Sequence, residues 1–256
     1  MALIALIIVG GFLYFVARLP DPILLTLDDR PPNLTVLASD GTVLAERALR
    51  RGYVRLARLA AFLPRGVIAS EDRRFYNHLG VDPIGLVRAS VRNLAAGTVV
   101  QGGSTITQQL AKNLFLSPDR TMARKLEEAI YAIWLERRFT KDEILELYLN
   151  RVYFGGGTYG VEAAARRYFG RSSRSVTLTQ AAMLAGLLKA PSRYAPTRNV
   201  ELASARVDVV LDNMVDAGFL TSAEASAAAA QPLRLRTFGD ETGFPYAVDW
   251  VAETLP

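Results

Sequence analysis

Residues 101–115 read QGGSTITQQLAKNLF, a glycine-rich turn that leads directly into a stretch with helical character. We expect the helix to run from Ile106 to Leu116, with Ser104 and Thr105 at its start. Unpaired backbone N–H groups and the positive end of the helix dipole at such a start favour a bound anion. The spacing of a nucleotide P-loop is absent, and a flexible turn with a serine cap is the simpler alternative.

Polar side chains continue along this helix. Gln108 comes one turn after Ser104 and Thr105, so Gln108 and Gln109 are expected to line the same edge with neutral donors suited to sugar hydroxyls. Lys112, one further turn along, adds a cation. The stretch therefore predicts a site for an anionic ligand that also carries hydroxyl groups.

A second polar cluster, EDRRF at residues 71–75, follows an apolar helical segment. In a functional interpretation, Glu71 is a general base whose pKa is tuned by apolar neighbours. A solvated helix face with mutually compensating charges is the alternative, and this segment alone favours it. His78, the single histidine of the chain, could bind phosphate or orient a carboxylate, although a lone histidine near a helix end more often caps or packs.

A third cluster, RKLEE, occupies residues 124–128. A helix beginning at Ser117-Pro118 would place Arg124 and Glu128 opposite an apolar stripe made of Met122, Leu126, Ala129, Ile130 and Ile133. Such a pair, with Lys125 beside it, is normally exposed and contributes about 0.3–0.5 kcal/mol. In a cleft, the same cations could hold a pyrophosphate group while Glu128 fixes their positions.

Lys189 follows an apolar stretch that begins at Leu178, and Pro191 comes shortly after it. A cation at the end of a helix is explained by the helix dipole alone. A functional role for Lys189 therefore needs evidence from elsewhere in the chain.

Composition narrows the possible partners. The 256 residues are 50% hydrophobic, enough for a buried core, and carry a net charge of +5. The positive surplus suits nucleic acid, anionic lipid or phosphorylated substrates, and the apolar N-terminal segment favours lipid and lipid phosphate. The absence of cysteine excludes disulfides, thiolate nucleophiles and cysteine-ligated zinc, and one histidine excludes a multi-histidine metal site.

The N-terminal part of the chain differs from the rest. Residues 1–19 are interpreted as a transmembrane anchor, because residues 1–17 are uncharged and would span roughly 25 Å as a helix. A signal peptide is the alternative, but no basic stretch or cleavage site accompanies the apolar run. Residues 20–58 are interpreted as a proline-rich linker and a small β-hairpin, whose strands alternate around Asp40-Gly41.

Residues 59–230 carry helical patterns and repeated helix-start signals, which predict a mainly α domain. The expected capping residues are Asp82, Ser117, Thr140, Thr177 and Thr221. Glycine at positions 97 and 218 marks two expected helix ends. Residues 231–256 are less regular, and we interpret them as the start of a linker, with 244–251 as a candidate strand.

Five segments in order resemble the motifs of the family 51 peptidoglycan glycosyltransferases, the membrane-anchored domain of class A penicillin-binding proteins that also occurs as monofunctional enzymes. The segments are EDRRFYNHLG, QGGSTITQQLAKNLF, RKLEE, KDEILELYLN and the stretch from RRYFG to LAGLLKAPSRYAP. The resemblance covers roughly residues 45–215. It implies a mainly α, lysozyme-like fold that acts on lipid II outside the bacterial cytoplasmic membrane.

The resemblance also implies roles for individual residues. Glu71 matches the catalytic base, and the residues that shape its surroundings are Asp72, Phe75 and His78. The second motif would line the donor and acceptor cleft with Ser104, Thr105, Gln108, Gln109 and Lys112. Glu128 matches the second essential carboxylate, and the cations expected to meet the donor's pyrophosphate are Arg124, Lys125 and Lys189.

The implied reaction polymerises lipid II into β-1,4-linked glycan by inverting transfer, with undecaprenyl pyrophosphate as the leaving group and moenomycin as an inhibitor associated with the family. No cofactor is required, although Mg²⁺ or Mn²⁺ could assist, and no compact acidic cluster specifies a metal site. The expected partners are lipid II, the growing glycan chain, the membrane and cell-wall synthesis proteins, without nucleic acid. We expect a single-pass protein of the cytoplasmic membrane with its catalytic domain on the periplasmic side.

Two competing functions remain open. One is a lysozyme-like lytic transglycosylase that cleaves glycan with one glutamate as general acid, and the other is a non-catalytic membrane scaffold. The Ser-x-x-Lys motif of a transpeptidase is absent from the sequence, and PYAVDWVAETL at residues 245–255 resembles the start of a connection to such a domain. We therefore interpret the chain as part of a bifunctional protein, with a monofunctional enzyme as the alternative.

Overall fold

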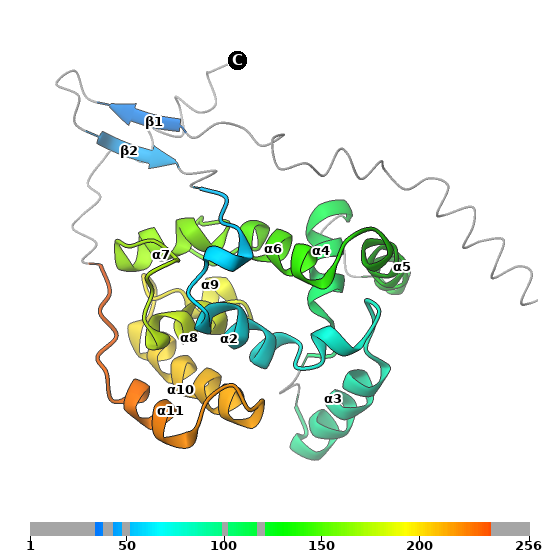
Figure 1. Ribbon diagram of the computed structural model, residues 1–256. Helices are drawn as coiled ribbons and strands as arrows, with labels where there is room; N and C mark the ends of the chain where they lie inside the picture. Colours follow the sequence, from blue (N-terminus) through cyan, green and yellow to red (C-terminus); the bar gives the residue numbers. More distant parts are fainter. Residues whose placement is uncertain (1–33, 38–42, 48–51, 99–101, 117–120, 237–256) are drawn as a thin grey trace, which may run out of the picture.

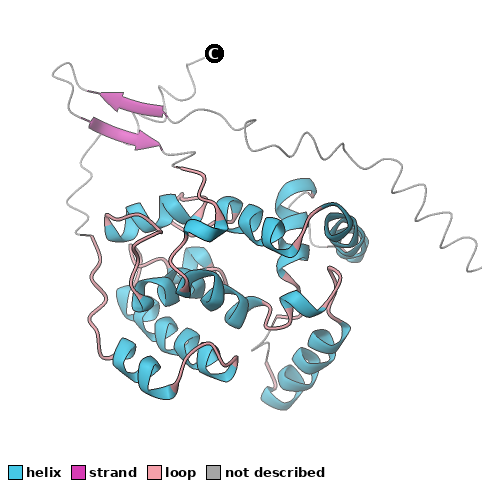
Figure 2. Cartoon of the chain, in the orientation of Figure 1, coloured by secondary structure: helices cyan, strands magenta, loops and turns pink. Residues whose placement is uncertain are grey.

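The computed structural model describes residues 34–37, 43–47, 52–98, 102–116 and 121–236, and this part of the chain is mainly helical (Figure 2). The expected anchor at residues 1–19 and the candidate strand at 244–251 lie outside the described residues. Among the helices that are described, none combines the length and the apolar character needed to cross a bilayer.

Two short strands precede the helices. Strand β1 (Leu34–Leu37) pairs antiparallel with β2 (Val43–Arg47), and the register shifts between Val36 and Leu37. The connecting residues 38–42, which include the turn expected at Asp40-Gly41, lie outside the described residues.

Three helices form the first packed group (Figure 1): α2 (Phe62–Glu71), α8 (Leu178–Leu187) and α10 (Val200–Asp216). Every residue of α8 from Thr179 onward is buried, as expected for a helix that is apolar on all faces. Gly66 of α2 lies where the three helices meet, because a Cβ atom there would lie 3.4 Å from the side chains of both Ala185 and Met214. The end of α2 is therefore held firmly, and Glu71 is its last residue.

The second group consists of α4 (Ile106–Phe115), α5 (Met122–Arg138) and α6 (Lys141–Arg151), with α4 packed against both other helices. Helix α7 (Val161–Phe169) contacts α6 and α8 and so connects the two groups. The smaller elements are η2 (Leu56–Arg58), η3 (Phe75–Asn77), α9 (Pro191–Tyr194) and α11 (Ser222–Ala229). Helix α3 (Pro83–Ala96) lies to one side of the bundle, and only Ala89 of its residues is buried (Figure 1).

Most of the helix boundaries follow the local signals in the sequence. Capping boxes form at Thr140, Thr177 and Thr221, and Gly97 ends α3 in the left-handed conformation. Asp82 precedes α3 as expected, but its side chain makes no capping hydrogen bond. Asp82 instead lies 3.6 Å from the guanidinium of Arg74, because a charged partner from the preceding turn competes with the helix start.

The start of α5 differs from the expectation. The helix begins at Met122 rather than Ser117, and the hydroxyl of its N-cap, Thr121, accepts a hydrogen bond from the backbone of Arg124 at 3.1 Å. Ser117-Pro118 lies outside the described residues.

The predicted apolar stripe of α5 is also wrong. Leu126, a member of that stripe, is 65% exposed, whereas Glu128 on the supposedly exposed side is only 3% exposed. Ala132 and Leu135 continue the buried face of α5 one and two turns after Glu128. At the first turns of α5 the buried position is taken by Glu128, which pairs with Arg124 and Lys125 of the same helix, and Lys125 also donates to Ser104 just before α4.

Candidate active site

Glu71 lies where α2 ends, and its carboxylate is partly buried. The side-chain amide of Gln109, from α4, donates a hydrogen bond to Glu71 Oε2 at 2.8 Å. The carbonyl oxygen of the same amide accepts a hydrogen bond from the hydroxyl of Tyr148, on α6, at 2.8 Å. Gln109 therefore contacts the expected catalytic carboxylate itself, rather than only lining the cleft around it.

Opposing influences act on the ionisation of Glu71. Burial raises its pKa, and the nearby Asp72 raises it further. The hydrogen bond from Gln109 and the charges of Arg206 and Lys189 lower the pKa, but burial prevails and the pKa stays above its usual value. A carboxylate with a raised pKa is a stronger base, so these surroundings suit proton abstraction.

Two cations of the first helix group, Lys189 and Arg206, lie close enough to Glu71 to lower its pKa. Lys189 follows α8 with an exposed side chain, and its pKa is lowered by partial desolvation and by Arg206, against the opposing effect of Glu71. Arg206 comes from α10 and crosses Gly186 of α8, where a Cβ atom would lie 2.7 Å from Arg206 Cγ. Its guanidinium lies 5.8 Å from the ring centroid of Tyr194.

Arg206 was not recognised from the sequence. The sequence feature that could have identified Arg206 is its position one turn before Val210 and one turn after Ala203, both of which are buried. A cation within an otherwise apolar helix face is unusual, and it indicates a nearby anion or a functional site.

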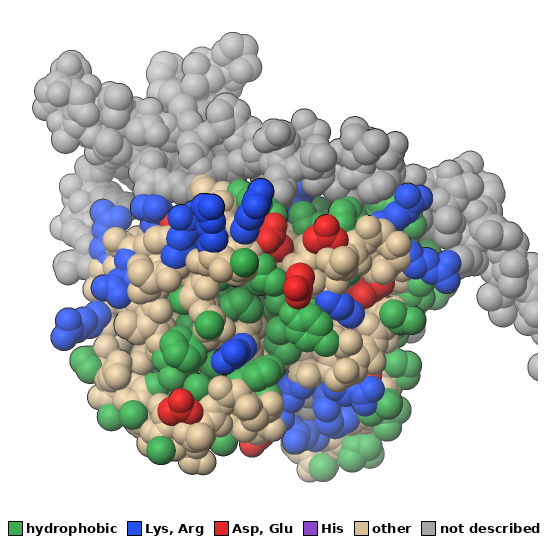
Figure 3. All heavy atoms as spheres, viewed as in Figure 1, with side chains coloured by type: hydrophobic (Ala, Val, Ile, Leu, Met, Phe, Trp, Pro, Cys, Tyr) green, Lys and Arg blue, Asp and Glu red, His purple; other side chains and the backbone are tan. Residues whose placement is uncertain are grey.

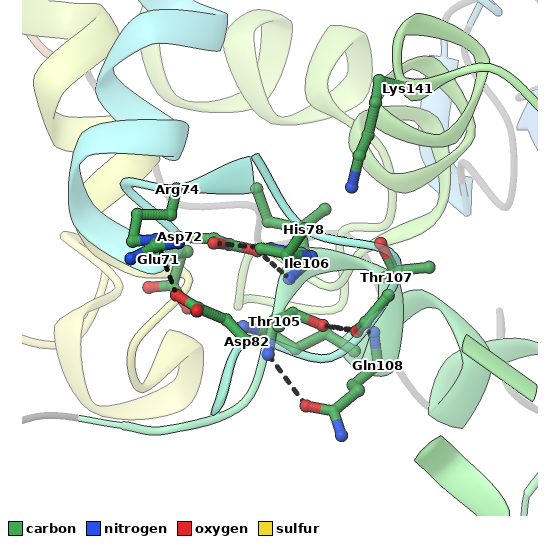
Figure 4. Close-up of polar contacts among 12 residues, drawn as sticks. Glu71, Asp72, Arg74, His78, Asp82, Thr105, Ile106, Thr107, Gln108 and Lys141 are labelled. Atoms are coloured by element: carbon green, nitrogen blue, oxygen red, sulfur yellow. Dashed lines mark hydrogen bonds and ion pairs between the residues drawn. The ribbon is translucent and has the colours of Figure 1, made fainter. Parts of the chain in front are cut away.

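The start of α4 holds an anion that belongs to the protein itself (Figure 4). Asp72 accepts a hydrogen bond from the backbone N–H of Ile106 at 3.0 Å, and its carboxylate lies 2.9 Å from Nε2 of His78. Asp72 and His78 are both buried. This corrects the expectation that the N–H groups at this helix start would be available to a ligand, because Asp72 occupies one of them.

Phe75 packs against the Asp72–His78 pair. Its side chain is completely buried, its ring lies edge-on to His78 with 6.3 Å between ring centroids, and Lys141 Nζ lies 4.4 Å from its centroid. Lys141 is itself paired with Glu136 at 2.7 Å. Phe75 therefore orients the Asp72–His78 pair through packing.

Thr105 and Gln108 are used to begin α4. The Thr105 hydroxyl accepts from the backbone of Gln108 at 3.1 Å, and Gln108 Oε1 accepts from the backbone of Thr105 at 3.0 Å, which completes a capping box. The Thr105 hydroxyl also donates to the carbonyl of Gly80. Both side chains are buried, so Gln108, which was expected to meet sugar hydroxyls, and Thr105, which was expected to line the cleft, have a role in positioning α4.

Glu128 gathers the basic pair of α5. One of its carboxylate oxygens accepts from Arg124, and the other accepts from Lys125 Nζ at 2.6 Å. Glu128 is buried, whereas the Lys125 side chain is 42% exposed. A buried carboxylate thus holds two cations together: the Lys125 side chain reaches the protein surface, and the Arg124 side chain is only 16% exposed.

Helix α4 connects the two acidic centres. Lys125 Nζ donates to Ser104 Oγ at 2.8 Å, and Ser104 directly precedes the N-cap of the helix to which Gln109 belongs. Glu71 is therefore attached to the first turns of α4 through Gln109, and Glu128 is attached to the same segment through Lys125. Lys112 is exposed further along α4, and none of the hydrogen bonds between described residues includes its side chain.

The part of the chain that the structure describes contains no group of three or more His, Asp or Glu side chains placed to hold a metal ion. The positive charge identified at the site comes from side chains on α5, on α10 and just after α8.

The chain is similar to known proteins in both sequence and structure. Residues 40–215 match the family model described as transglycosylase. Penicillin-binding protein 1A of Aquifex aeolicus is 43% identical over 235 residues, which cover 91% of this chain and 32% of that protein. Penicillin-binding protein 1A of Escherichia coli is 40% identical over 251 residues, which cover 97% of this chain and 30% of that protein.

The fold is similar to the crystal structure of penicillin-binding protein 1A from Haemophilus influenzae, with a TM-score of 0.54 and 26% identity. The match covers 87% of this chain and 23% of that one. The chain spans about a third of the length of its curated relatives. Because the family model covers more than half of the residues, the chain belongs to the transglycosylase family, and its resemblance to the glycosyltransferase domain of class A penicillin-binding proteins is confirmed.

Proposed function

We propose that this chain is a peptidoglycan glycosyltransferase domain that polymerises lipid II into β-1,4-linked glycan, with inversion and release of undecaprenyl pyrophosphate. Membership of the transglycosylase family and similarity to proteins named penicillin-binding protein 1A support this activity and a lysozyme-like helical fold. The observation that carries the proposal is the attachment of Glu71, through Gln109, and of the Arg124–Lys125–Glu128 cluster, through Ser104, to one short segment at the start of α4.

The proposed reaction divides its work between these two centres. Glu71 accepts the proton of the acceptor's 4-hydroxyl as that oxygen bonds to the anomeric carbon of the donor. The bond from this carbon to the pyrophosphate oxygen breaks, and the leaving group departs from the opposite face. Arg124 and Lys125 stabilise the negative charge of the pyrophosphate, held in place by Glu128. No nucleophilic side chain is needed.

The proposal requires no cofactor. Mg²⁺ or Mn²⁺ would assist pyrophosphate departure if it were bound together with the substrate. Polymerisation in the presence of EDTA, followed by addition of each ion, measures that contribution.

The decisive experiment mixes the purified protein with labelled lipid II in vesicles, with and without moenomycin. The proposal expects glycan polymer that moenomycin suppresses. Release of fragments from finished peptidoglycan, without polymer from lipid II, would identify a lytic enzyme instead. Binding of lipid II without any product would identify a scaffold.

The pH dependence of turnover should report the ionisation of Glu71. Its carboxylate must be ionised to accept a proton, so activity is present above its folded-state pKa and is lost as the pH falls through that value. Because burial raises this pKa, the acidic limb of kcat/KM should lie above the ordinary glutamate value of about 4.3. Initial rates of polymerisation across the acidic range test this. A limb at or below the ordinary value would contradict the role of Glu71.

We place the domain against the bilayer that carries its lipid substrate, on the periplasmic face. Figure 3 shows apolar and basic side chains gathered over the region of α3 at the lower right. The exposed apolar residues of this helix are Ile84, Leu86, Val87, Val91 and Leu94, and Arg92 is exposed among them. An exposed apolar face that also carries cations is suited to an anionic lipid surface.

Substitution of Val91 and Leu94 by glutamate should lower polymerisation of vesicle-embedded lipid II by at least about 100-fold, since burying each side chain is worth about 1.5–3 kcal/mol and the two together about 3–6 kcal/mol. Turnover of detergent-solubilised lipid II should change little. Val209→Glu is the matched control, because Val209 is a 42% exposed apolar residue on α10. Equal losses in vesicles and detergent would argue against a membrane-facing α3.

A further inference from the structure

Tyr148 combines complete burial with a hydrogen bond to the candidate active site. Its side chain has no exposed surface. It belongs to α6, which packs against α4. Its hydroxyl donates to Gln109 Oε1, and Gln109 Nε2 donates to Glu71 Oε2, each at 2.8 Å. A continuous chain of donors thus runs from the core to the expected base.

The direction of this chain matters because an amide has two different ends. Gln109 can present either its N–H group or its carbonyl oxygen to Glu71. With the tyrosine proton on the carbonyl oxygen, the N–H group points at Glu71 and favours the ionised carboxylate. Donors in series also polarise one another, which strengthens the bond to Glu71.

We propose that Tyr148 is a positioning residue of the reaction described above, on which this inference rests: its hydroxyl orients the Gln109 amide so that the N–H group holds Glu71 in its ionised, proton-accepting form. Tyr148 contacts neither substrate nor reacting atoms. It acts through Gln109 alone.

The other charged groups around Glu71 do not depend on this bond. Asp72 adjoins Glu71 at the end of α2, Lys189 follows α8 and Arg206 extends from α10. Burial, followed by the charges of Glu71 and Asp72, raises the pKa of Tyr148 well above its usual value, so the phenol stays protonated throughout the assay range. Tyr148→Phe therefore removes one donor without changing any charge.

Tyr148→Phe should move the acidic limb of the kcat/KM profile to higher pH. The loss of activity should be roughly 3- to 10-fold on the acidic limb, the factor expected for one hydrogen bond. Turnover should approach the wild-type rate at pH values well above the limb, where Glu71 is ionised in both proteins. A purely structural defect would instead lower activity by the same factor at every pH.

Tyr168→Phe is the matched control. Tyr168 is equally buried, and its hydroxyl donates to the backbone carbonyl of Phe154 at 3.0 Å, within α7 and the loop before it. This variant should lose comparable stability while its pH profile keeps the wild-type position.

A double-mutant cycle tests whether Tyr148 acts through the amide. Gln109→Ala should itself move the acidic limb to higher pH, and Tyr148→Phe should then add no further shift. Gln109→Ala also serves if Tyr148→Phe fails to fold, because an unmoved limb in that variant overturns the inference.

An acidic limb that stays in place or moves to lower pH in Tyr148→Phe also overturns the inference. The proposed function survives that result if Glu71→Gln is inactive. If a folded Glu71→Gln protein polymerised lipid II at the wild-type rate, Glu71 would not be the base. That result would contradict both the proposed role of Glu71 and the inference about Tyr148.

Discussion

Glu71→Gln is expected to lower kcat for lipid II polymerisation by about 10³-fold while the protein stays folded. The amide has nearly the same shape and can still contact Gln109, but it cannot accept the proton of the acceptor hydroxyl. Rates with labelled lipid II, normalised to folded protein, measure the loss. Retained polymerisation would exclude Glu71 as the base.

The same substitution should leave stability at neutral pH unchanged or higher. Burial raises the folded-state pKa of Glu71, so the folded protein binds this proton more tightly than the unfolded chain. Stability therefore falls as the pH rises past the unfolded-state pKa, and the variant escapes that loss. Thermal unfolding at neutral pH should show an equal or higher Tm for the variant than for the wild type. The difference should vanish in acid, where Glu71 is protonated in both the folded and the unfolded wild-type protein.

Glu224→Gln is the control for Glu71→Gln. Glu224 completes the capping box of α11 on the surface, so its replacement should affect only the local helix start and leave turnover at the wild-type rate. A large loss of turnover in Glu224→Gln would show that the assay reports stability rather than chemistry.

Glu128→Gln is expected to lower turnover by about 100-fold and to destabilise the fold as well. The charges of Arg124 and Lys125 then lose the carboxylate that holds them, and their N–H groups no longer keep the orientation needed for pyrophosphate. Breaking a buried ion pair costs about 3–5 kcal/mol, and the exposure of Lys125 places this case at the lower end. Turnover per folded molecule and chemical denaturation separate the two effects.

The matched control for Glu128 is Glu162→Gln. Glu162 is equally buried and accepts hydrogen bonds from Arg166 and from the side chain and backbone of Ser173, away from α4. Its replacement should reduce stability but leave turnover per folded molecule unchanged. If both variants lose only stability, Glu128 has a structural role and the basic pair does not depend on it.

Local sequence signals predicted much of the helical framework. The capping boxes at Thr140, Thr177 and Thr221 and the glycine end of α3 depend on residues three or four positions apart, so they can be recognised without knowledge of the fold. The ordered motifs likewise identified the family, because family resemblance resides in residue order and spacing.

The sequence was less informative wherever a residue's role depends on a distant partner. Gln108 was expected to meet sugar hydroxyls and Thr105 to line the cleft, but the two form a capping box, and the Thr105 hydroxyl also donates to the carbonyl of Gly80. The α5 stripe was assigned to the wrong face, because periodicity does not reveal whether a face meets apolar or polar neighbours. Glu128 lies on the side of α5 that was expected to be exposed, but it is buried.

The sequence by itself determined the helical class, the capping boxes at Thr140, Thr177 and Thr221 and the family, since each follows from spacing along the chain. Only the tertiary structure decided that Asp72 occupies the start of α4, that the charge of Arg206 acts on Glu71 and that Tyr148 reaches Glu71 through Gln109. The physical reason is that these contacts join segments from different helices. Burial, which raises the pKa of Glu71, arises only when those helices pack together.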